Sequence, residues 1–124
     1  MIFHPRTLPL WLCMAIIFYF SSKSNTPSAI SWFVGADKVA HFLAFFGLAL
    51  CACYSIPLQY WKSKTRLWLL VVFVFSCTYA ASDEFHQSFV PGRLVSWKDW
   101  LADVFGSLTA IIIVWRFAIW KKFG

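Results

Sequence analysis

Residues 67–80, LWLLVVFVFSCTYA, contain no charged side chain, whereas the next stretch, ASDEFHQSFVPGR at 81–93, carries two acids, a histidine and an arginine. The apolar run does not alternate between apolar and polar residues, as the strands of a membrane barrel do. A helix over residues 67–87 is about 30 Å long, which matches the hydrocarbon thickness of a bilayer. The sequence therefore predicts a transmembrane helix that ends in a group of polar side chains.

The composition of the whole chain also indicates a membrane protein. Of the 124 residues, 60% are apolar and only 13% are charged, which is about half the charged fraction of soluble domains. The 11 basic residues fall between apolar runs and form no basic face of the kind that binds nucleic acid. We expect one domain over residues 1–124 that contacts the lipid bilayer and binds no nucleic acid.

Four apolar segments predict an all-α fold, an integral membrane four-helix bundle. The expected helices cover residues 8–22, 37–56, 67–87 and 97–120. The first is the weakest span, since its short apolar core followed by SSKSNTPSA (21–29) also fits a signal peptide. The segment lacks an A-x-A cleavage pattern, which favours a retained helix.

The distribution of charge predicts the orientation of these helices. The two ends of the chain and the second loop hold seven Lys and Arg residues, and the first and third loops hold four. Because positive residues gather on the cytoplasmic side, both termini are expected to be cytoplasmic. An antiparallel bundle then brings all five acids to the outward end, namely Asp37, Asp83, Glu84, Asp99 and Asp103.

Spacing along the helices places several of these groups on shared faces. Asp37 and His41 are four residues apart, as are Asp83 and Gln87, so each pair lies on one helix face. Asp37 also has a structural interpretation as a helix N-cap. Two acids at a helix C-terminus oppose the helix dipole, so capping does not explain Asp83 and Glu84.

The segment that connects the last two helices carries a cation and a helix start signal. Pro91 and Gly92 predict a type II turn that returns Arg93 toward the helices. Ser96 and Asp99 have the S-x-x-D spacing of a capping box, so Asp99 has a structural interpretation as well.

Asp103 lies one turn deeper in the last helix. An unpaired acid at the centre of a membrane costs about 3 kcal/mol, and less near the interface, so Asp103 needs a partner. The candidates are His41, Lys38 and Arg93. Small residues follow on the same face and predict close packing against the second helix; they are Gly106, Ser107 and Ala110.

Four ordered motifs resemble the VanZ-like family of small bacterial integral membrane proteins. They are FYFSSK (18–23), DKVAHFLAFFGLAL (37–50), DEFHQSFVPGR (83–93) and LADVFGS (101–107). The resemblance implies a multi-pass protein of the bacterial cytoplasmic (inner) membrane that is linked to glycopeptide resistance, especially to teicoplanin. Asp103 departs from the family pattern, because many relatives carry Asn at this position.

The first functional hypothesis is an outward-facing polar site for an anionic lipid-linked or peptidoglycan-related molecule. Whether the protein is an enzyme stays open, because no GxSxG or HExxH motif is present. The candidates for acid–base catalysis are Glu84, His41 and Asp103. The candidates for substrate binding are Asp37, Lys38, Asp83, Gln87, Arg93 and Asp99. We expect no cofactor.

Three alternatives stay open from the sequence. The polar residues can form an interhelical lock in a non-enzymatic structural or interaction protein. A metal site is a second alternative, with Asp37, His41, Glu84 and Asp103 as its ligands. A proton-coupled transporter is a third, but four short spans without an internal repeat argue against it unless the protein forms an oligomer.

Overall fold

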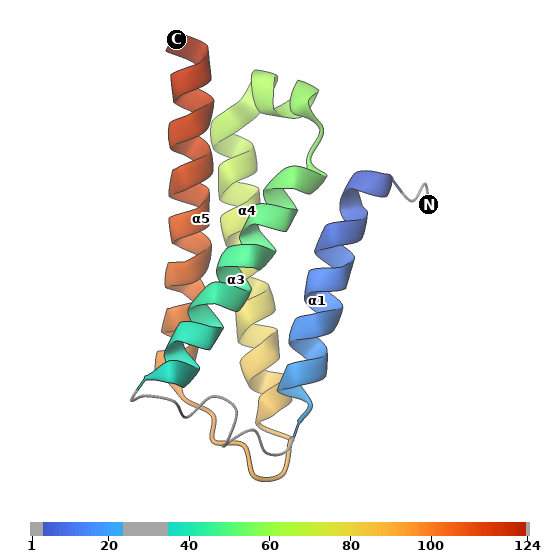
Figure 1. The fold of residues 1–124 in the computed structure, drawn as a ribbon, viewed down its shortest axis with the longest axis vertical. Coiled ribbons are helices and arrows are strands. Elements are labelled where there is room, and N and C mark those ends of the chain that lie inside the picture. Colours follow the sequence, from blue (N-terminus) through green and yellow to red (C-terminus); the bar gives the residue numbers. More distant parts are fainter. Residues whose placement is uncertain (1–3, 24–34, 124) are drawn as a thin grey trace.

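The computed structural model describes residues 4–23 and 35–123, and Figure 1 shows them as a bundle of helices. A short 3-10 turn, η1 (Pro5–Thr7), leads into α1 (Leu8–Ser21). The other helices of these described residues are α3 (Ala36–Ser55), α4 (Leu58–Gln87) and α5 (Trp97–Phe123). The described residues contain no strand. The prediction of an all-α four-helix fold is confirmed.

Three of the helices have the length and composition of membrane spans. α3, α4 and residues Trp97–Ala118 of α5 are long and apolar enough to cross a bilayer, whereas η1 and α1 together form a shorter apolar helix. Large apolar side chains such as Leu43, Phe85 and Phe105 are more than half exposed. An outer surface of this kind suits contact with lipid and not with water.

The start of α4 differs from the prediction. α4 begins at Leu58, directly after Pro57, and not near residue 67. The backbone leaves helical geometry at Lys64 (φ −142°, ψ 53°), so the charged segment is a helical turn bent away from the span. Lys, Arg and Gln are good helix formers, and therefore the charged residues allow helix on both sides of the kink although the apolar pattern stops.

α5 packs closely against α3. A Cβ atom built on Gly106 would lie 2.1 Å from the backbone oxygen of Phe42, so only glycine fits at this crossing. The Ser107 hydroxyl donates a hydrogen bond to the backbone oxygen of Phe45 at 3.4 Å, and Ala110 is fully buried. The small-residue face of the last helix therefore packs on the second predicted span, as expected.

The chain direction brings four helix ends together. α1 begins and α5 ends at one end of the bundle (Figure 1). The end of α1, the start of α3, the end of α4 and the start of α5 meet at the opposite end. A core cluster of Ile17, Phe45, Leu48 and Ala80 lies beneath this second end and supports the polar side chains above it.

Candidate polar site

The end of the bundle at which α1 ends and α3 begins holds all five acids of the protein. Four of the five are buried, and the exception is Asp37. The structure places every residue of the predicted site at this end. We call this set, together with Ser21, the polar site; its members are Ser21, Asp37, Lys38, His41, Asp83, Glu84, Gln87, Arg93, Asp99 and Asp103.

Two polar contacts join α3 to α5. The imidazole Nδ1 of His41 lies 2.8 Å from Oδ1 of Asp103, whose side chain is fully buried. The ammonium group of Lys38 contacts Asp99 Oδ1 and also lies 2.6 Å from Asp37 Oδ2. An acid buried as deeply as Asp103 was expected to need a partner, and that partner is His41.

The helix starts explain how Asp99 and Asp37 are placed. The backbone N–H of Lys98 donates to the Ser96 hydroxyl at 3.2 Å, so Ser96 caps α5 as predicted. Asp99 turns its carboxylate toward α3. The N-cap interpretation of Asp37 is wrong, because Gly35 occupies that position with φ 87° and Asp37 lies in the first turn of α3.

A second network joins α1 to α4. The Ser21 hydroxyl donates to Asp83 Oδ1 at 2.5 Å, and the Gln87 amide donates to Asp83 Oδ2 at 2.9 Å. The Gln87 amide also lies 3.3 Å from the Ser21 hydroxyl. The spacing of Asp83 and Gln87 predicted their contact, but sequence reasoning missed Ser21. The feature that could have identified Ser21 is its position in FYFSSK, at the polar end of the first apolar run.

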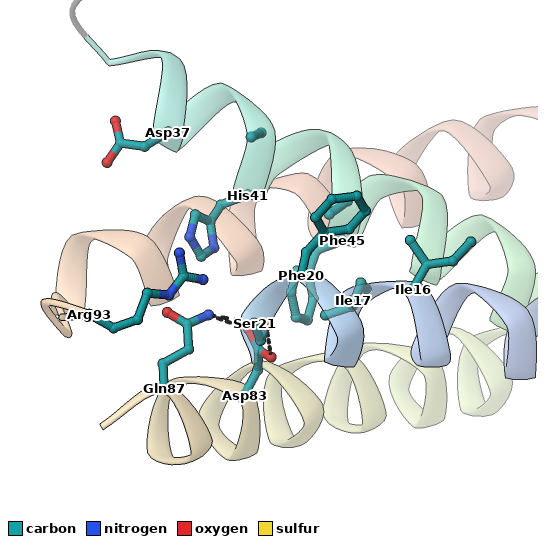
Figure 2. A pocket seen from close by; sticks show the side chains of 12 residues that line it. Ile16, Ile17, Phe20, Ser21, Asp37, His41, Phe45, Asp83, Gln87 and Arg93 are labelled. Carbon is teal, nitrogen blue, oxygen red and sulfur yellow. Dashed lines mark hydrogen bonds between the residues drawn. The ribbon is translucent and has the colours of Figure 1, made fainter. Parts of the chain in front are cut away.

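Two groups of the polar site lack partners. Glu84 is only 7% exposed, and both of its carboxylate oxygens are buried without a hydrogen bond. The Nε atom of Arg93 is buried and unpaired as well. Gly92 has φ 80°, and the backbone N–H of Arg93 donates to the Val90 oxygen at 3.2 Å, as the predicted turn requires. Figure 2 shows that this turn directs the Arg93 guanidinium toward His41.

A cavity of about 350 Å³ opens beside these groups, between α1, α3 and α4. Its polar end contains His41, Asp83, Gln87 and Arg93, and Figure 2 shows the Asp37 carboxylate pointing away from them. Its apolar wall is formed mainly by Ile16, Ile17, Phe20, Ala44 and Phe45. The cavity therefore joins a polar end to an apolar wall.

His86, the histidine of the DEFHQ motif, lies outside the cavity lining. Its ring stacks on Phe18 with centroids 4.7 Å apart, and its Nε2 lies 3.0 Å from the Ser22 hydroxyl.

Within residues 4–23 and 35–123, two overlapping sets of three side chains have the spacing to hold a metal ion. His41, Glu84 and Asp99 form one set, and Asp83, Glu84 and Asp103 form the other. In each set the ligand atoms lie within 4.8 Å of one another. Asp37, which the sequence placed in the alternative metal site, belongs to neither set. Glu84 is common to both.

The arrangement offers two kinds of chemistry. Arg93 supplies hydrogen-bond donors for an anion at the polar end of the cavity. Glu84 and His41 are side chains of the type that transfers protons, and Asp103 orients the His41 ring. The paired residues, by contrast, tie helices together.

Comparison with known proteins agrees with the resemblance of the motifs. A family model described as VanZ/LLP1 matches residues 6–120, which include the whole polar site. No curated protein and no solved structure matches the chain significantly. The family match and the three long apolar helices establish that this chain belongs to the VanZ/LLP1 family and is a membrane protein.

Proposed function

We propose that the protein binds an anionic amphiphile, a lipid-linked phosphate or a peptidoglycan-related molecule, in the cavity between α1, α3 and α4. The observation that supports this proposal most directly is the division of the cavity into a polar end and an apolar wall. A volume of about 350 Å³ is at the small end of ligand pockets. A cavity of this volume suits a phosphate group and the first methylene groups of a lipid chain.

Arg93 is the group that would bind the anion. Its guanidinium points into the polar end of the cavity, and its Nε has no hydrogen-bond partner. A guanidinium binds phosphate or carboxylate through two parallel hydrogen bonds. Lys38 is less suited to this role, because its ammonium group already contacts Asp37 and Asp99.

The apolar wall would receive the lipid chain. Ile16 and Phe20 line the cavity, and both are more than half exposed on the outside of α1. The cavity thus opens toward the surface that contacts lipid. An amphiphile could enter from the bilayer with its headgroup at Arg93 and its chain beside α1.

The proposal includes the cellular setting. We place the protein in the bacterial inner membrane as a multi-pass protein with both termini in the cytoplasm, which leaves the polar site facing outward. The excess of Lys and Arg at the opposite end of the bundle supports this orientation. An envelope precursor held at this surface would lower susceptibility to teicoplanin, which is the activity that the family resemblance implies.

The test is a measurement of lipid retention by the purified full chain. Wild-type protein in nanodiscs is expected to retain an isoprenoid-linked phosphate in native mass spectrometry and to release the uncharged isoprenoid alcohol. Arg93→Ala should weaken retention about tenfold or more, the loss expected for hydrogen bonds to a charged group. Arg93→Lys should also weaken it, because the planar fork is lost.

Lys98→Ala is the matched control, since Lys98 is an exposed cation at the same end of the bundle. It should leave retention unchanged. Full retention by Arg93→Ala would refute anion binding at this site. The same variants, expressed in cells, should lose teicoplanin resistance in the same order.

The second candidate function is an interhelical lock in a non-enzymatic interaction protein. The contacts of His41 with Asp103 and of Ser21 with Asp83 favour it, because each joins two helices. The two functions predict different effects of the same substitutions. A lock predicts that Ser21→Ala lowers the yield of folded protein while Arg93→Ala has no effect on either yield or lipid retention.

A further inference from the structure

The buried acids of the polar site outnumber the cations that face them. Four of the five carboxylates at this end are buried, and the cations that face them are Lys38, Arg93 and, if it is protonated, His41. One buried negative charge is left over even then, and two are left over if His41 is neutral. Buried charge without a counter-ion is strongly unfavourable, so either protons or a bound cation must neutralise it.

Glu84 is a buried acid that no cation among the described residues contacts. Glu84 is only 7% exposed, and neither of its carboxylate oxygens has a hydrogen-bond partner. Oδ2 of Asp103, in a fully buried side chain, is unpaired too. Native proteins satisfy nearly all buried polar atoms, so these oxygens are available to a bound cation.

We propose that Glu84, His41 and Asp99 bind a divalent cation of the Mn²⁺ or Zn²⁺ type. Their ligand atoms lie within 4.8 Å of one another, a little wider than the separation of about 3 to 4.2 Å between ligands at about 2.1 Å from one ion. One imidazole with two carboxylates suits these metals better than Ca²⁺, which prefers oxygen ligands alone.

The neighbouring contacts leave the required atoms free. Nδ1 of His41 is held by Asp103, and Nε2 lies 4.0 Å from Asp99 Oδ2. Lys38 contacts the other Asp99 oxygen, Oδ1. A carboxylate on the second nitrogen of the imidazole is typical of metal-binding histidines, because it orients the ring and raises its basicity.

The site also has a path for entry. His41 and the exposed residue Asp37 both line the cavity. An ion could therefore reach the His41 ring without opening the bundle. This inference goes beyond the proposed lipid binding and does not require it, because cation binding is measured without an amphiphile.

The experiment is equilibrium dialysis of the metal-stripped full chain, purified in an uncharged detergent, against Mn²⁺ and separately against Zn²⁺. Bound metal is quantified by elemental mass spectrometry, and bound Mn²⁺ by loss of the free-ion EPR signal. The expected result is one ion per chain. Glu84→Gln and His41→Gln should each weaken binding at least tenfold. Asp103→Asn should weaken it by about 10- to 100-fold, because the Asp103 carboxylate orients the His41 ring.

Two variants serve as matched controls. Asp37→Asn removes a carboxylate of the same end that belongs to neither ligand set, and His86→Gln removes a histidine that stacks on Phe18. Both should bind the ion as the wild type does. Equal weakening by Asp37→Asn and Glu84→Gln would overturn the proposal, since it would indicate attraction by net charge alone.

A folding defect can be separated from a binding defect. Mn²⁺ should raise the unfolding temperature of the wild type in proportion to the logarithm of its concentration, and not that of Glu84→Gln. The Glu84 carboxylate makes no hydrogen bond, so its amide variant loses none. Absence of any bound ion and of any shift in the wild type would refute the site, whatever the outcome of the lipid measurements.

Discussion

At the scale of single residues, the polar site contains two sets of residues with different roles. His41, Asp103 and Ser21 make contacts between helices, whereas Glu84 and Arg93 end without partners. The paired residues hold the helix ends together. The unpaired residues are the ones to which we assign ligands, because a buried polar atom without a partner costs free energy that binding recovers.

The pair of His41 and Asp103 should contribute strongly to stability. Asp103→Ala leaves a buried imidazole without its partner and is expected to lower the free energy of unfolding by about 3 kcal/mol. Asp103→Asn keeps an oxygen that accepts from Nδ1–H of His41 and should cost less. Denaturant unfolding in detergent measures both values.

Asp37→Ala is the control for this comparison. The Asp37 side chain is 56% exposed, and its ion pair with Lys38 lies at the surface. A pair of this kind contributes at most about 1 kcal/mol. If Asp37→Ala were as harmful as Asp103→Ala, the buried pair would have no special role.

At the scale of elements, the crossing of α3 and α5 positions the site. Both helices begin at the polar end, and their separation is set where Gly106 meets the backbone of Phe42. Close approach of the backbones allows Lys38 and His41 on one helix to reach Asp99 and Asp103 on the other. The small-residue face therefore supports the geometry of the ionisable groups.

Gly106→Ala should destabilise the bundle by about 1 to 3 kcal/mol, since the added methyl group must push α5 away from α3. The matched control is Gly47→Ala in α3, where a new Cβ meets nothing within 4 Å. Replacing a helical glycine with alanine at such a position is expected to stabilise by about 0.5 to 1 kcal/mol. Thermal unfolding in detergent compares the two; similar midpoints would contradict the close crossing.

At the scale of the whole molecule, the bundle has one polar end and one basic end. The polar site lies at the end of the bundle where α1 ends, and α4 starts and α5 ends at the opposite end (Figure 1). The kink at Lys64 is near the start of α4. The bilayer separates these two ends if α3, α4 and α5 span it. Only one of them can then face the outside of the cell.

Cysteine labelling tests which end faces outward. A membrane-impermeant maleimide added to intact cells should label Ser88→Cys, at the polar end, and should not label Lys64→Cys. Both positions are exposed, so accessibility within the protein does not differ. After the cells are broken, both variants should react. Labelling of Lys64→Cys alone in intact cells would reverse the proposed orientation.

The amino-acid sequence determined the class of fold because lipid imposes a simple rule. Apolar runs long enough to cross a bilayer must be helices, and the acids placed at their ends must meet when consecutive helices alternate in direction. The depth of Asp103 also predicted a partner for it and named His41, Lys38 and Arg93 as the candidates, of which the structure shows His41. Periodicity did not reveal the helical turn before Lys64, since the apolar pattern stops there while helix propensity continues.

The tertiary structure alone decided which polar groups pair and which stay free. Ser21 and Asp83 come from helices far apart in the chain, and nothing in their local sequence specifies a 2.5 Å contact. Glu84 and Asp83 are neighbours in one acidic motif, yet only Asp83 receives hydrogen bonds. The physical reason is geometric, because adjacent residues on a helix point in directions about 100° apart and therefore meet different neighbouring helices.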